Sequence, residues 1–350
     1  MNTTLNYTTA KHFLLALFDK VGLPSPKATI TTEILLEGEL LGHRTHGLHL
    51  TMPYIDHILK GSMETHGEFE VLNQTLASEL WDGRYLAGPW LIDEAINKAG
   101  KIASEFGVGT IVIQKSSHIA CLAAYMEKAT KNGNMVIVAS SDPDNTTVAP
   151  FGGTTGVYSP NPLALGIPTE SDPLIIDVSM SATSNGLIHQ KNKLNEKLDY
   201  PWLLTSDGKA SDDPKTFFEE SPSTILPLGG LDSGYKGFAL GIMIEALTSA
   251  LGGFGRISEP GRWGASVFVQ VINPNKFSGE SYFQKEMENL RQKSFASKSV
   301  KEVQPVRLPG QRGLALKKIQ LEKGLQLRTD TAEGLKKLAQ TYNIQVDFDS

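Results

Sequence analysis

The first sixty residues carry an apolar pattern with helical spacing. Its first stripe predicts an amphipathic helix over residues 8–21. Ser25 followed by Pro26 is typical of a helix cap and first turn, and predicts a second helix that runs to about residue 41. A third helical pattern starts at residue 48 and stops at Gly61. This part of the chain is therefore predicted to be almost entirely helical.

From about residue 71 the pattern changes to short apolar runs that alternate with helical ones. Helices are predicted over residues 90–106 and 119–131, and a charged helical tail begins at about residue 280, interrupted by a loop at 306–313. The strand-like runs are SELWDG, GTIVIQ, GNMVIVASS, PLIIDVSM and SVFVQVI. Because strands alternate with helices, the sequence predicts an α/β or α+β fold. At 350 residues the chain is long enough for two domains.

The charge balance narrows the choice of partners. The net charge is −5 and no run of Lys or Arg forms a block, which argues against nucleic acid or anionic membranes. The most basic segment, residues 317–323, alternates with apolar residues and is predicted to be the solvated face of a helix. No apolar run is long enough for a membrane span. A small-molecule ligand remains the expected partner.

The cysteine count and the first residues bear on the compartment. The single cysteine, Cys121, excludes an internal disulfide framework and fits a reducing compartment. It lies in a helical pattern, where a buried and inert thiol is expected. The first twenty residues lack the pattern of a signal peptide. We therefore expect a cytoplasmic protein.

Histidines are concentrated at predicted element junctions. Four of the eight lie in the segment LLGHRTHGLHLTMPYIDHILKG at residues 40–61. His46 follows the end of a helix, so it either projects into a site or caps the helix, and Gly47 lets backbone or a ligand come close. His118 lies at the carboxyl end of a strand-like run, where α/β proteins bind ligands, although it could equally cap a helix beside Ser116 and Ser117. Two histidines at such junctions favour acid–base chemistry near neutral pH.

Two glycine-rich stretches are candidates for binding a phosphate-bearing ligand. Residues 150–186 suit either such a ligand or purely structural loops. In GGLDSGYKGFALG a glycine-rich approach is predicted to lead into a helix over residues 238–251. Lys236 at its mouth suits a phosphate or a carboxylate, or is a plain surface residue. The GxGxxG fingerprint of Rossmann domains and the common zinc motifs are absent, so no metal site is expected.

Taken together, these motifs resemble the malate/L-lactate dehydrogenase type 2 family. The matches run in order through almost the whole chain: GHRTHGL, WDG, SSHI, VAPFGG, NPLALGIP, IIDVSMS, YKGFAL and RLPG. The family includes ureidoglycolate dehydrogenase, 2,3-diketogulonate reductase, cyclic-imine reductases and a broad hydroxycarboxylate dehydrogenase. The resemblance implies a non-Rossmann nicotinamide-binding domain with a mixed sheet over residues 76–299. It also implies a helical domain built from residues 1–75 and 300–350, and a homodimer or larger homo-oligomer.

The resemblance implies roles for individual residues. His118 and His46 match the family's proposed proton-transfer histidines. We expect His118 to exchange the proton and His46 to orient and polarise the carbonyl, with the reverse assignment open. NAD or NADP is the implied cofactor. The residues implied to contact it are Ser141, Ile176, Asp177, Val178, Ser179, Met180, Ser181, Tyr235, Lys236, Gly310, Gln311 and Arg312.

One position departs from the family pattern. Many members have an arginine four residues after the first histidine, which can hold a substrate carboxylate through two parallel hydrogen bonds, but Leu50 stands there in this chain. Either Arg44 or another basic group supplies this clamp, or the substrate has a larger apolar part that packs on Leu50 and Met52.

The resemblance therefore predicts an NAD(P)-dependent oxidoreductase that passes a hydride between nicotinamide and a 2-hydroxy or 2-oxo acid. A reductase of cyclic imino acids is the first alternative. A catalytically silent family member that acts as a binding protein is the second.

Overall fold

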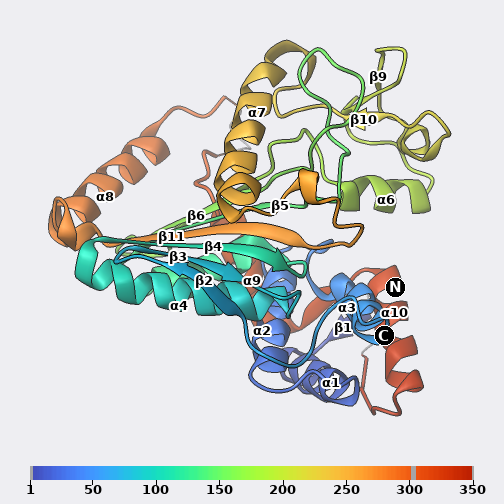
Figure 1. Ribbon diagram of the computed structural model, residues 1–350, viewed down its shortest axis with the longest axis horizontal. Coiled ribbons are helices and arrows are strands. Elements are labelled where there is room, and N and C mark those ends of the chain that lie inside the picture. Colours follow the sequence, from blue (N-terminus) through green and yellow to red (C-terminus); the bar gives the residue numbers. More distant parts are fainter. Residues whose placement is uncertain (1–2, 301–304, 349–350) are drawn as a thin grey trace.

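A seven-stranded mixed sheet lies at the centre of the protein, whose computed structural model describes residues 3–300 and 305–348 (Figure 1). The pair β3–β4 is parallel and the other neighbouring pairs of this sheet are antiparallel. The mixed sheet that the resemblance implied is therefore confirmed. In sheet order the strands are β2 (Glu70–Gln74), β3 (Ser78–Asp82), β4 (Val108–Ser116), β11 (Ala265–Ile272), β5 (Met135–Ser141), β6 (Leu163–Ile167) and β7 (Leu174–Val178).

The apolar runs that predicted strands form five of the seven strands of this sheet, including its central strand β11. They correspond to β3, β4, β5, β7 and β11, so all five strand predictions are confirmed. The central strand β11 reads as one continuous apolar run because helices cover both of its faces. The sequence did not predict β2 and β6. All of β2 is exposed and lacks an alternating apolar pattern, and β6 lies within the stretch of glycines and prolines at 150–186.

Two long helices cover the two faces of the sheet (Figure 1). The helix α4 (Gly88–Phe106) packs on β4 and β11 from one side and confirms the helix predicted at 90–106. The helix α7 (Gly230–Glu245) crosses the opposite face and continues as the π-helical segment η4 (Ala246–Ala250), which packs on β5 and β11. The sheet is thus buried between them, which fixes the positions of the strand ends.

The glycine-rich sequence that was predicted to form a ligand-binding loop is the first part of the helix α7. The helix already begins at Gly230, so Lys236 lies in its second turn and not at its mouth. The glycines serve close packing: a Cβ on Gly237 would lie 2.4 Å from the carbonyl oxygen of Leu228, and one on Gly241 would lie 2.6 Å from the ring of Tyr158. The loop interpretation was wrong because these glycines admit neighbouring chain and ring atoms instead of a ligand.

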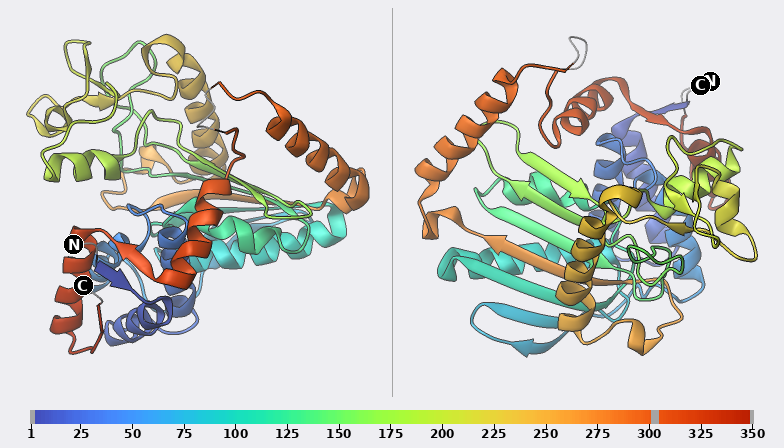
Figure 2. Two further views of the ribbon diagram at one scale, coloured as in Figure 1. Left: turned by 180° about the vertical axis from the view of Figure 1, so that it is seen from behind. Right: turned by 90° about the horizontal axis from the view of Figure 1, so that it is seen from above.

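The two ends of the chain meet beside the sheet (Figure 2). The strand β1 (Thr3–Leu5) pairs antiparallel with β12 (Leu325–Leu327). Around this pair lie the helices α1 (Tyr7–Lys20), α2 (Lys27–Leu40), α3 (Thr51–Leu59), α9 (Gln311–Lys323) and α10 (Thr329–Thr341). The helices predicted from residues 8, 25 and 48 are therefore confirmed, although Pro26, not Ser25, stands in the cap position of α2 and the cap makes no side-chain hydrogen bond. The parts of the predicted domains at residues 1–2, 301–304 and 349–350 lie outside the described residues.

Lys317 on α9 is the exception to the predicted solvated helix face, whereas the side chain of Lys318 in the same segment is 66% exposed. The ammonium group of Lys317 lies 2.7 Å from a carboxylate oxygen of Glu37 and 2.7 Å from one of Glu127, and its side chain is 19% exposed. Glu37 lies on α2 and Glu127 on α5 (Met126–Thr130). Lys317 therefore faces two acidic partners from elsewhere in the chain, and it joins three helices instead of facing water.

The helix α8 (Glu280–Ala296) extends away from the rest of the protein (Figures 1 and 2). None of its residues is buried, and Tyr282, Leu290 and Phe295 remain 42–63% exposed. It confirms the helical, charged tail predicted from about residue 280. Among the described residues, no helix combines the length and apolar character needed to cross a lipid bilayer.

Candidate active site

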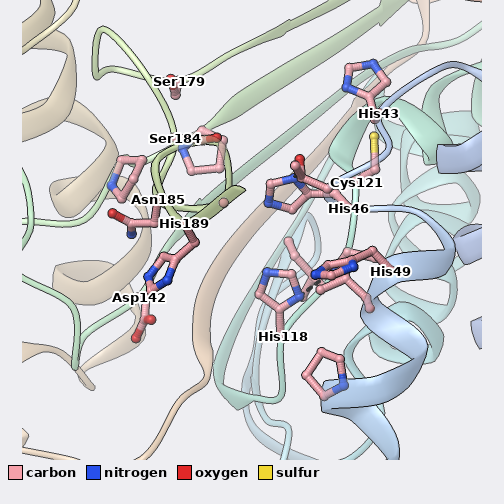
Figure 3. Close-up of a pocket in the computed structure, with 18 of the residues that line it drawn as sticks. His43, His46, His49, His118, Cys121, Asp142, Ser179, Ser184, Asn185 and His189 are labelled. Atoms are coloured by element: carbon pink, nitrogen blue, oxygen red, sulfur yellow. Dashed lines mark hydrogen bonds between the residues drawn. The ribbon is translucent and has the colours of Figure 1, made fainter. Parts of the chain in front are cut away.

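A cavity of about 1110 Å³ opens between the sheet and the helices of the chain ends. One wall carries His43, His46, His49 and His118 together with Cys121 (Figure 3). The facing wall carries Asp142, Ser179, Ser184, Asn185 and His189 (Figure 3). The two histidines singled out from the sequence, His46 and His118, therefore line one cavity although they are 72 positions apart in the chain.

His118 is held on three sides just beyond the end of β4. Its ring stacks on Trp263 at a centroid distance of 4.4 Å, and the ring of His46 lies 5.9 Å away on a nearly parallel plane. The Tyr54 hydroxyl lies 3.0 Å from Nδ1 of His118 and donates to the backbone oxygen of the same residue at 2.9 Å. The backbone N–H of Ala120 also donates to Nδ1 at 3.2 Å. These contacts leave Nε2 as the ring nitrogen free to meet a ligand.

The loop around His118 differs from the helix predicted at residues 119–131. The chain becomes helical only at η2 (Leu122–Tyr125), which leads into α5. Ser117 does cap a helix, but it caps α4: its hydroxyl accepts a hydrogen bond from the backbone N–H of Gly88 at 2.8 Å. The serine thereby ties His118 to the start of α4 instead of starting a helix of its own.

Burial sets the charge of both histidines. It lowers the pKa of His118 well below the usual range, with smaller contributions in the same direction from His46 and His57. It lowers the pKa of His46 to about 4, again with help from neighbouring histidines. Both rings are therefore neutral near pH 7 and can each offer one N–H and one free nitrogen lone pair.

His46 sits on a turn that is fixed from below by Glu39. The Glu39 carboxylate is 1% exposed and accepts the backbone N–H of Leu48 at 3.0 Å. A Cβ on Gly47 would lie 2.6 Å from Oε2 of Glu39, so only glycine fits between the turn and α2. This confirms that a glycine after His46 permits a close approach, and identifies the approaching group as α2. On the turn itself, the Thr45 hydroxyl lies 3.0 Å from Nδ1 of His46.

Leu50 lies in the wall of the cavity, 7% exposed, within the 3₁₀ helix η1 (Leu48–Leu50). His49, Arg328 and Asp330 line the cavity with it, and α10 packs on both η1 and α3. Arg44 is not among the described residues that line this cavity. The sequence had suggested Arg44 as a carboxylate clamp, and that role stays a prediction.

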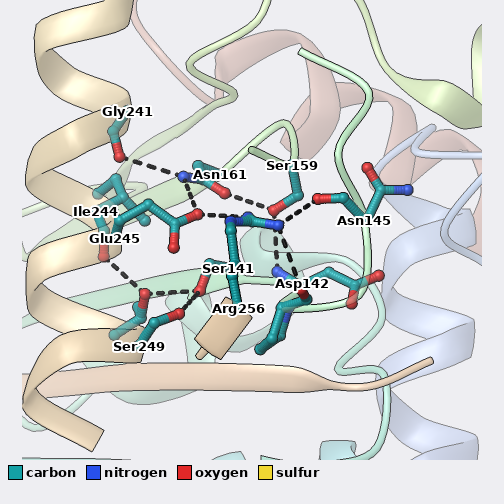
Figure 4. Close-up of polar contacts among 12 residues, drawn as sticks. Ser141, Asp142, Asn145, Ser159, Asn161, Gly241, Ile244, Glu245, Ser249 and Arg256 are labelled. Carbon is teal, nitrogen blue, oxygen red and sulfur yellow. Dashed lines mark hydrogen bonds and ion pairs between the residues drawn. The ribbon is translucent and has the colours of Figure 1, made fainter. Parts of the chain in front are cut away.

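The facing wall contains a buried polar network (Figure 4). Asn161 donates to Glu245 at 2.9 Å, Arg256 donates to Glu245 at 2.6 Å, and Arg256 also donates to the backbone oxygen of Asn145 at 2.6 Å. Ser159 accepts the backbone N–H of Asp142 at 2.9 Å. The network thus fixes the backbone from which Asp142 faces the cavity. Burial raises the pKa of Asp142 to about 7, so its carboxyl group changes charge near neutrality.

A second cavity of about 450 Å³ adjoins the first, and His43 and Asp177 line both. Asp177 lies in β7 and accepts the backbone N–H of Ala123 at 2.9 Å. Arg307 and Arg312 bring positive charge to the second cavity. Gly310, in a left-handed conformation, precedes the first turn of α9 there. Together the two cavities form one extended site with an acid–base end and a cationic end.

The predicted cofactor residues divide into those that reach a cavity and those that do not. Asp177, Ser179, Gly310 and Arg312 line one or both cavities. Ser141 is buried and its hydroxyl bonds the hydroxyls of Thr248 and Ser249 (Figure 4); its neighbours Ser140 and Asp142 line the cavity instead. The remaining predicted residues line neither cavity in the described structure: Ile176, Val178, Met180, Ser181, Tyr235, Lys236 and Gln311.

Cys121 is buried, as predicted, and burial together with Asp177 raises the pKa of its thiol well above the usual range. Its sulfur, a ring nitrogen of His43 and a carboxylate oxygen of Asp177 all lie within 4.8 Å of one another. No sequence pattern pointed to this group, because its members come from three separate segments of the chain. That no metal is bound stays a prediction.

Comparison with known proteins identifies the family. The sequence matches the malate/L-lactate dehydrogenase family over residues 5–336. The chain belongs to this family. Malate/(S)-sulfolactate dehydrogenase of Methanothermus fervidus is 26% identical over 350 residues, which cover 97% of this chain and 98% of that protein.

Two further proteins are similar to this chain, one in sequence and one in fold. The Delta(1)-pyrroline-2-carboxylate/Delta(1)-piperideine-2-carboxylate reductase of Pseudomonas putida is 25% identical, with 95% of this chain and 96% of that protein covered. The crystal structure of malate dehydrogenase from Entamoeba histolytica has the same fold, with a TM-score of 0.94 at 23% identity over 99% of this chain and 100% of that one. As a member of the malate/L-lactate dehydrogenase family, the chain is an oxidoreductase whose chemistry concerns hydroxy and oxo acids.

Sequence reasoning missed several residues around His118. Tyr54 occupies a buried position of α3, where its hydroxyl needs a hydrogen-bond partner. A tyrosine within an apolar helical pattern is therefore a signal that the sequence does contain. Trp263 stands in a loop and Arg328 lies at the opposite end of the chain from the histidine segment. Their positions depend on packing between distant segments, so no local pattern in this family member could have pointed to them.

Proposed function

We propose that this protein is an NAD(P)-dependent 2-hydroxyacid dehydrogenase, or in the opposite direction a 2-oxo acid reductase. The observation that carries the proposal is the pair His46 and His118, neutral and side by side in the wall of a large cavity. A reaction that interconverts a hydroxyl and a carbonyl needs a group that takes or returns one proton. Two neutral imidazoles in a cavity of this size can supply that group and hold the carbonyl beside it.

The extended site fits a dinucleotide cofactor. The two adjoining cavities together exceed the volume of ordinary small-molecule pockets. Arg307 and Arg312 suit phosphate groups, and Asp177 and Ser179 stand between them and the histidines. We propose that these residues, with Gly310, hold NAD or NADP. When bound, the cofactor supplies the hydride exchange with C2 of the substrate.

His118 is the better placed of the two histidines to move a proton. Its Nδ1 can accept from Ala120, or it can donate to the oxygen of Tyr54, whose own proton goes to the backbone oxygen of His118. Nδ1 therefore has a partner both with and without its proton, so Nε2 can gain or lose one while the ring stays in place. His46 lies 5.9 Å away and orients and polarises the carbonyl.

Relatives suggest the class of acid. The Methanothermus fervidus relative is named for malate and sulfolactate, both 2-hydroxy acids with a second acidic group. We propose that this protein accepts a 2-oxo acid of similar size. The Pseudomonas putida relative supports the first alternative, reduction of a cyclic imino acid. Leu50, which stands where many family members have an arginine, supports the second alternative, a binding protein without catalytic activity.

The test is oxidation of NADH and of NADPH by the purified protein with 2-oxo acids from pyruvate to phenylpyruvate, including oxaloacetate and sulfopyruvate. We expect turnover with one acid and one cofactor, and a loss of at least 100-fold in kcat for His118→Ala. His66→Ala is the matched control, because His66 is exposed and lies outside both cavities. Silence across the acids with turnover of an amine-generated imine would establish the alternative. Silence with both, while the cofactor still binds, would refute the enzymatic proposal.

Tyr54 allows a second test of the proton path. Tyr54→Phe removes the acceptor for Nδ1–H of His118 and should lower kcat about 10-fold, which corresponds to about 1.4 kcal/mol, without changing cofactor affinity. Tyr125→Phe is the control, because the Tyr125 hydroxyl is also buried and bonds the same loop at Ile119 but does not touch the ring. Equal losses in the two variants would mean that the hydroxyl of Tyr54 has only a structural role.

We also propose a homodimer in the cytoplasm, with two domains formed by residues 1–75 with 300–350 and by residues 76–299. Residues of both sets line the cavity: His43, His46 and His49 come from the first set, and His118 and Asp142 come from the second, which supports a site between domains. The homodimer is supported by α8, because a helix with no buried residue is marginally stable alone in water. A second copy of the chain would cover its apolar side chains.

A further inference from the structure

The cavity needs a cation for the substrate carboxylate, and Leu50 cannot provide one. Among the described residues, the Lys and Arg side chains that line the cavity are those of Lys193 and Arg328. Lys193 is exposed at the end of α6 (Asn185–Lys193). Arg328 lines the same cavity with His49 and Leu50. Burial lowers the pKa of His49, and the charges of Arg328 and Lys193 act in the same direction, so both cations lie near this histidine. Arg328 is favoured because its side chain is only 13% exposed and is held by an ion pair, whereas Lys193 is exposed.

Arg328 is brought to this wall by the C-terminal part of the chain. It follows β12, which pairs with β1, and occupies the N-cap position of α10. Because α10 packs on η1 and α3, the start of α10 is set against the 3₁₀ helix that carries Leu50. The side chain of Arg328 is 13% exposed, so its position is fixed by packing rather than by solvent.

The guanidinium group of Arg328 has a hydrogen-bond donor without a partner among the described residues. Nη2 donates to Asp330 at 2.6 Å, which holds the group in place. In the described structure Nη1 is buried and has no hydrogen-bond partner. A guanidinium has five N–H donors in a rigid fork, and leaving a buried one unpaired is costly. Because Nη1 is closed to water in this structure, an acceptor in the cavity meets it only when the side chain of Arg328 shifts toward the cavity that it lines.

We propose that Arg328 binds the carboxylate of the substrate and replaces, from the other end of the chain, the arginine that Leu50 displaces. This inference rests on the proposed function and assigns the specificity for acids to a residue outside the family's histidine segment. Arg328 and Asp330 form an ion pair through Nη2 that keeps the fork oriented, and among the described residues Nη1 has no competing acceptor. Leu50 then packs against the substrate carbon atoms instead of its charge.

The decisive measurement is the binding of oxamate, a 2-oxo acid analogue that cannot be reduced, to the full-length protein saturated with reduced cofactor. Calorimetry should show that Arg328→Gln raises the Kd of oxamate about 10- to 100-fold, the range for a lost charged hydrogen bond. The KM of the oxo acid should rise in parallel, with a smaller change in kcat and an unchanged Kd for the cofactor. Lys193→Gln removes the exposed cation of the same cavity and should leave the Kd of oxamate within about 2-fold.

A second variant separates binding from structure. Leu50→Arg in the Arg328→Gln background should recover at least part of the affinity for oxamate, because it returns an arginine to the same wall; a merely structural role for Arg328 would not be rescued in this way. Unchanged oxamate binding in Arg328→Gln, a failed rescue, or a loss in Lys193→Gln instead would each overturn the assignment. The readout is independent of turnover: a wild type that binds oxamate through Arg328 but reduces no oxo acid would refute the proposed reaction and leave the binding site established.

Discussion

Glu39 is buried beneath the turn that carries His46, and its ionisation should oppose folding at neutral pH. Burial raises its pKa from 4.5 to about 7, although the Leu48 N–H and the charges of Arg44 and Arg328 act in the other direction. A raised pKa means that the folded state binds more protons than the unfolded state between these two values, so stability falls as the pH rises through this window. At about 1.4 kcal/mol for each pKa unit, the full effect is about 3 kcal/mol.

Glu39→Gln removes this ionisation while it keeps an acceptor for the N–H of Leu48. The difference in unfolding free energy between the variant and the wild type should therefore be close to constant only below about pH 4, under the unfolded pKa of 4.5. It should then grow in favour of the variant by about 3 kcal/mol by pH 8.5. Urea unfolding, followed by tryptophan fluorescence at one protein concentration and at five pH values from 4.5 to 8.5, measures this difference.

The control is Glu33→Gln, which removes a partly exposed carboxylate from the same helix together with its ion pair to Lys11, and reports the effect of losing a surface charge and its partner. If the difference for Glu39→Gln varied by less than about 0.5 kcal/mol over the whole range, Glu39 would not titrate there and the argument from burial would fail. Activity should change little, because the turn keeps its hydrogen bond and Gly47 its close contact with α2.

Two further predictions concern packing and assembly. Gly88→Ala would place a Cβ 2.5 Å from the backbone oxygens of Ser117 and His118, so it should lower the stability by about 1–3 kcal/mol and remove most of the activity. Gly100→Ala lies in the same helix with open space around it, so it should raise the stability by about 0.5–1 kcal/mol. Thermal unfolding and kcat of the two variants test this difference. Sedimentation should give the mass of a homodimer for the wild type and of a monomer when Leu290 on α8 is changed to Glu, and a wild-type monomer would contradict the proposed assembly.

Local patterns predicted the elements well wherever the apolar pattern follows burial. The stripe at residues 8–21 became α1 because it marks one covered face, and the run SVFVQVI became β11 because both of its faces are covered. The helix predicted over residues 238–251 is also present, as the second half of α7 with η4, but its start was missed. Gly237 already lies in the helix and packs against the backbone of Leu228, and nothing in the local sequence distinguishes this from a loop.

The candidate site was predictable as far as it depends on chain order. Motifs pointed to His46 and His118, and the structure places both in one cavity. The groups that tune them come from elsewhere: Trp263 stacks on His118 from the loop before β11, and Glu39 fixes His46 from α2. The sequence carries no spacing that links such pairs, since they meet only when the sheet and the helices of the chain ends pack together.

The pairing of β1 with β12 also determines when the site can form during synthesis. The sheet, both histidines and the wall containing Asp142 are complete in the growing chain long before residues 325–341 have been made. The first strand of the protein must wait, unpaired, for nearly the last one, and Arg328 and α10 reach His49 and Leu50 only then. A nascent chain that still lacks residues 325–341 can therefore hold a folded sheet while its pocket lacks Arg328 and α10, so the proposed acid site forms only after this segment has been made.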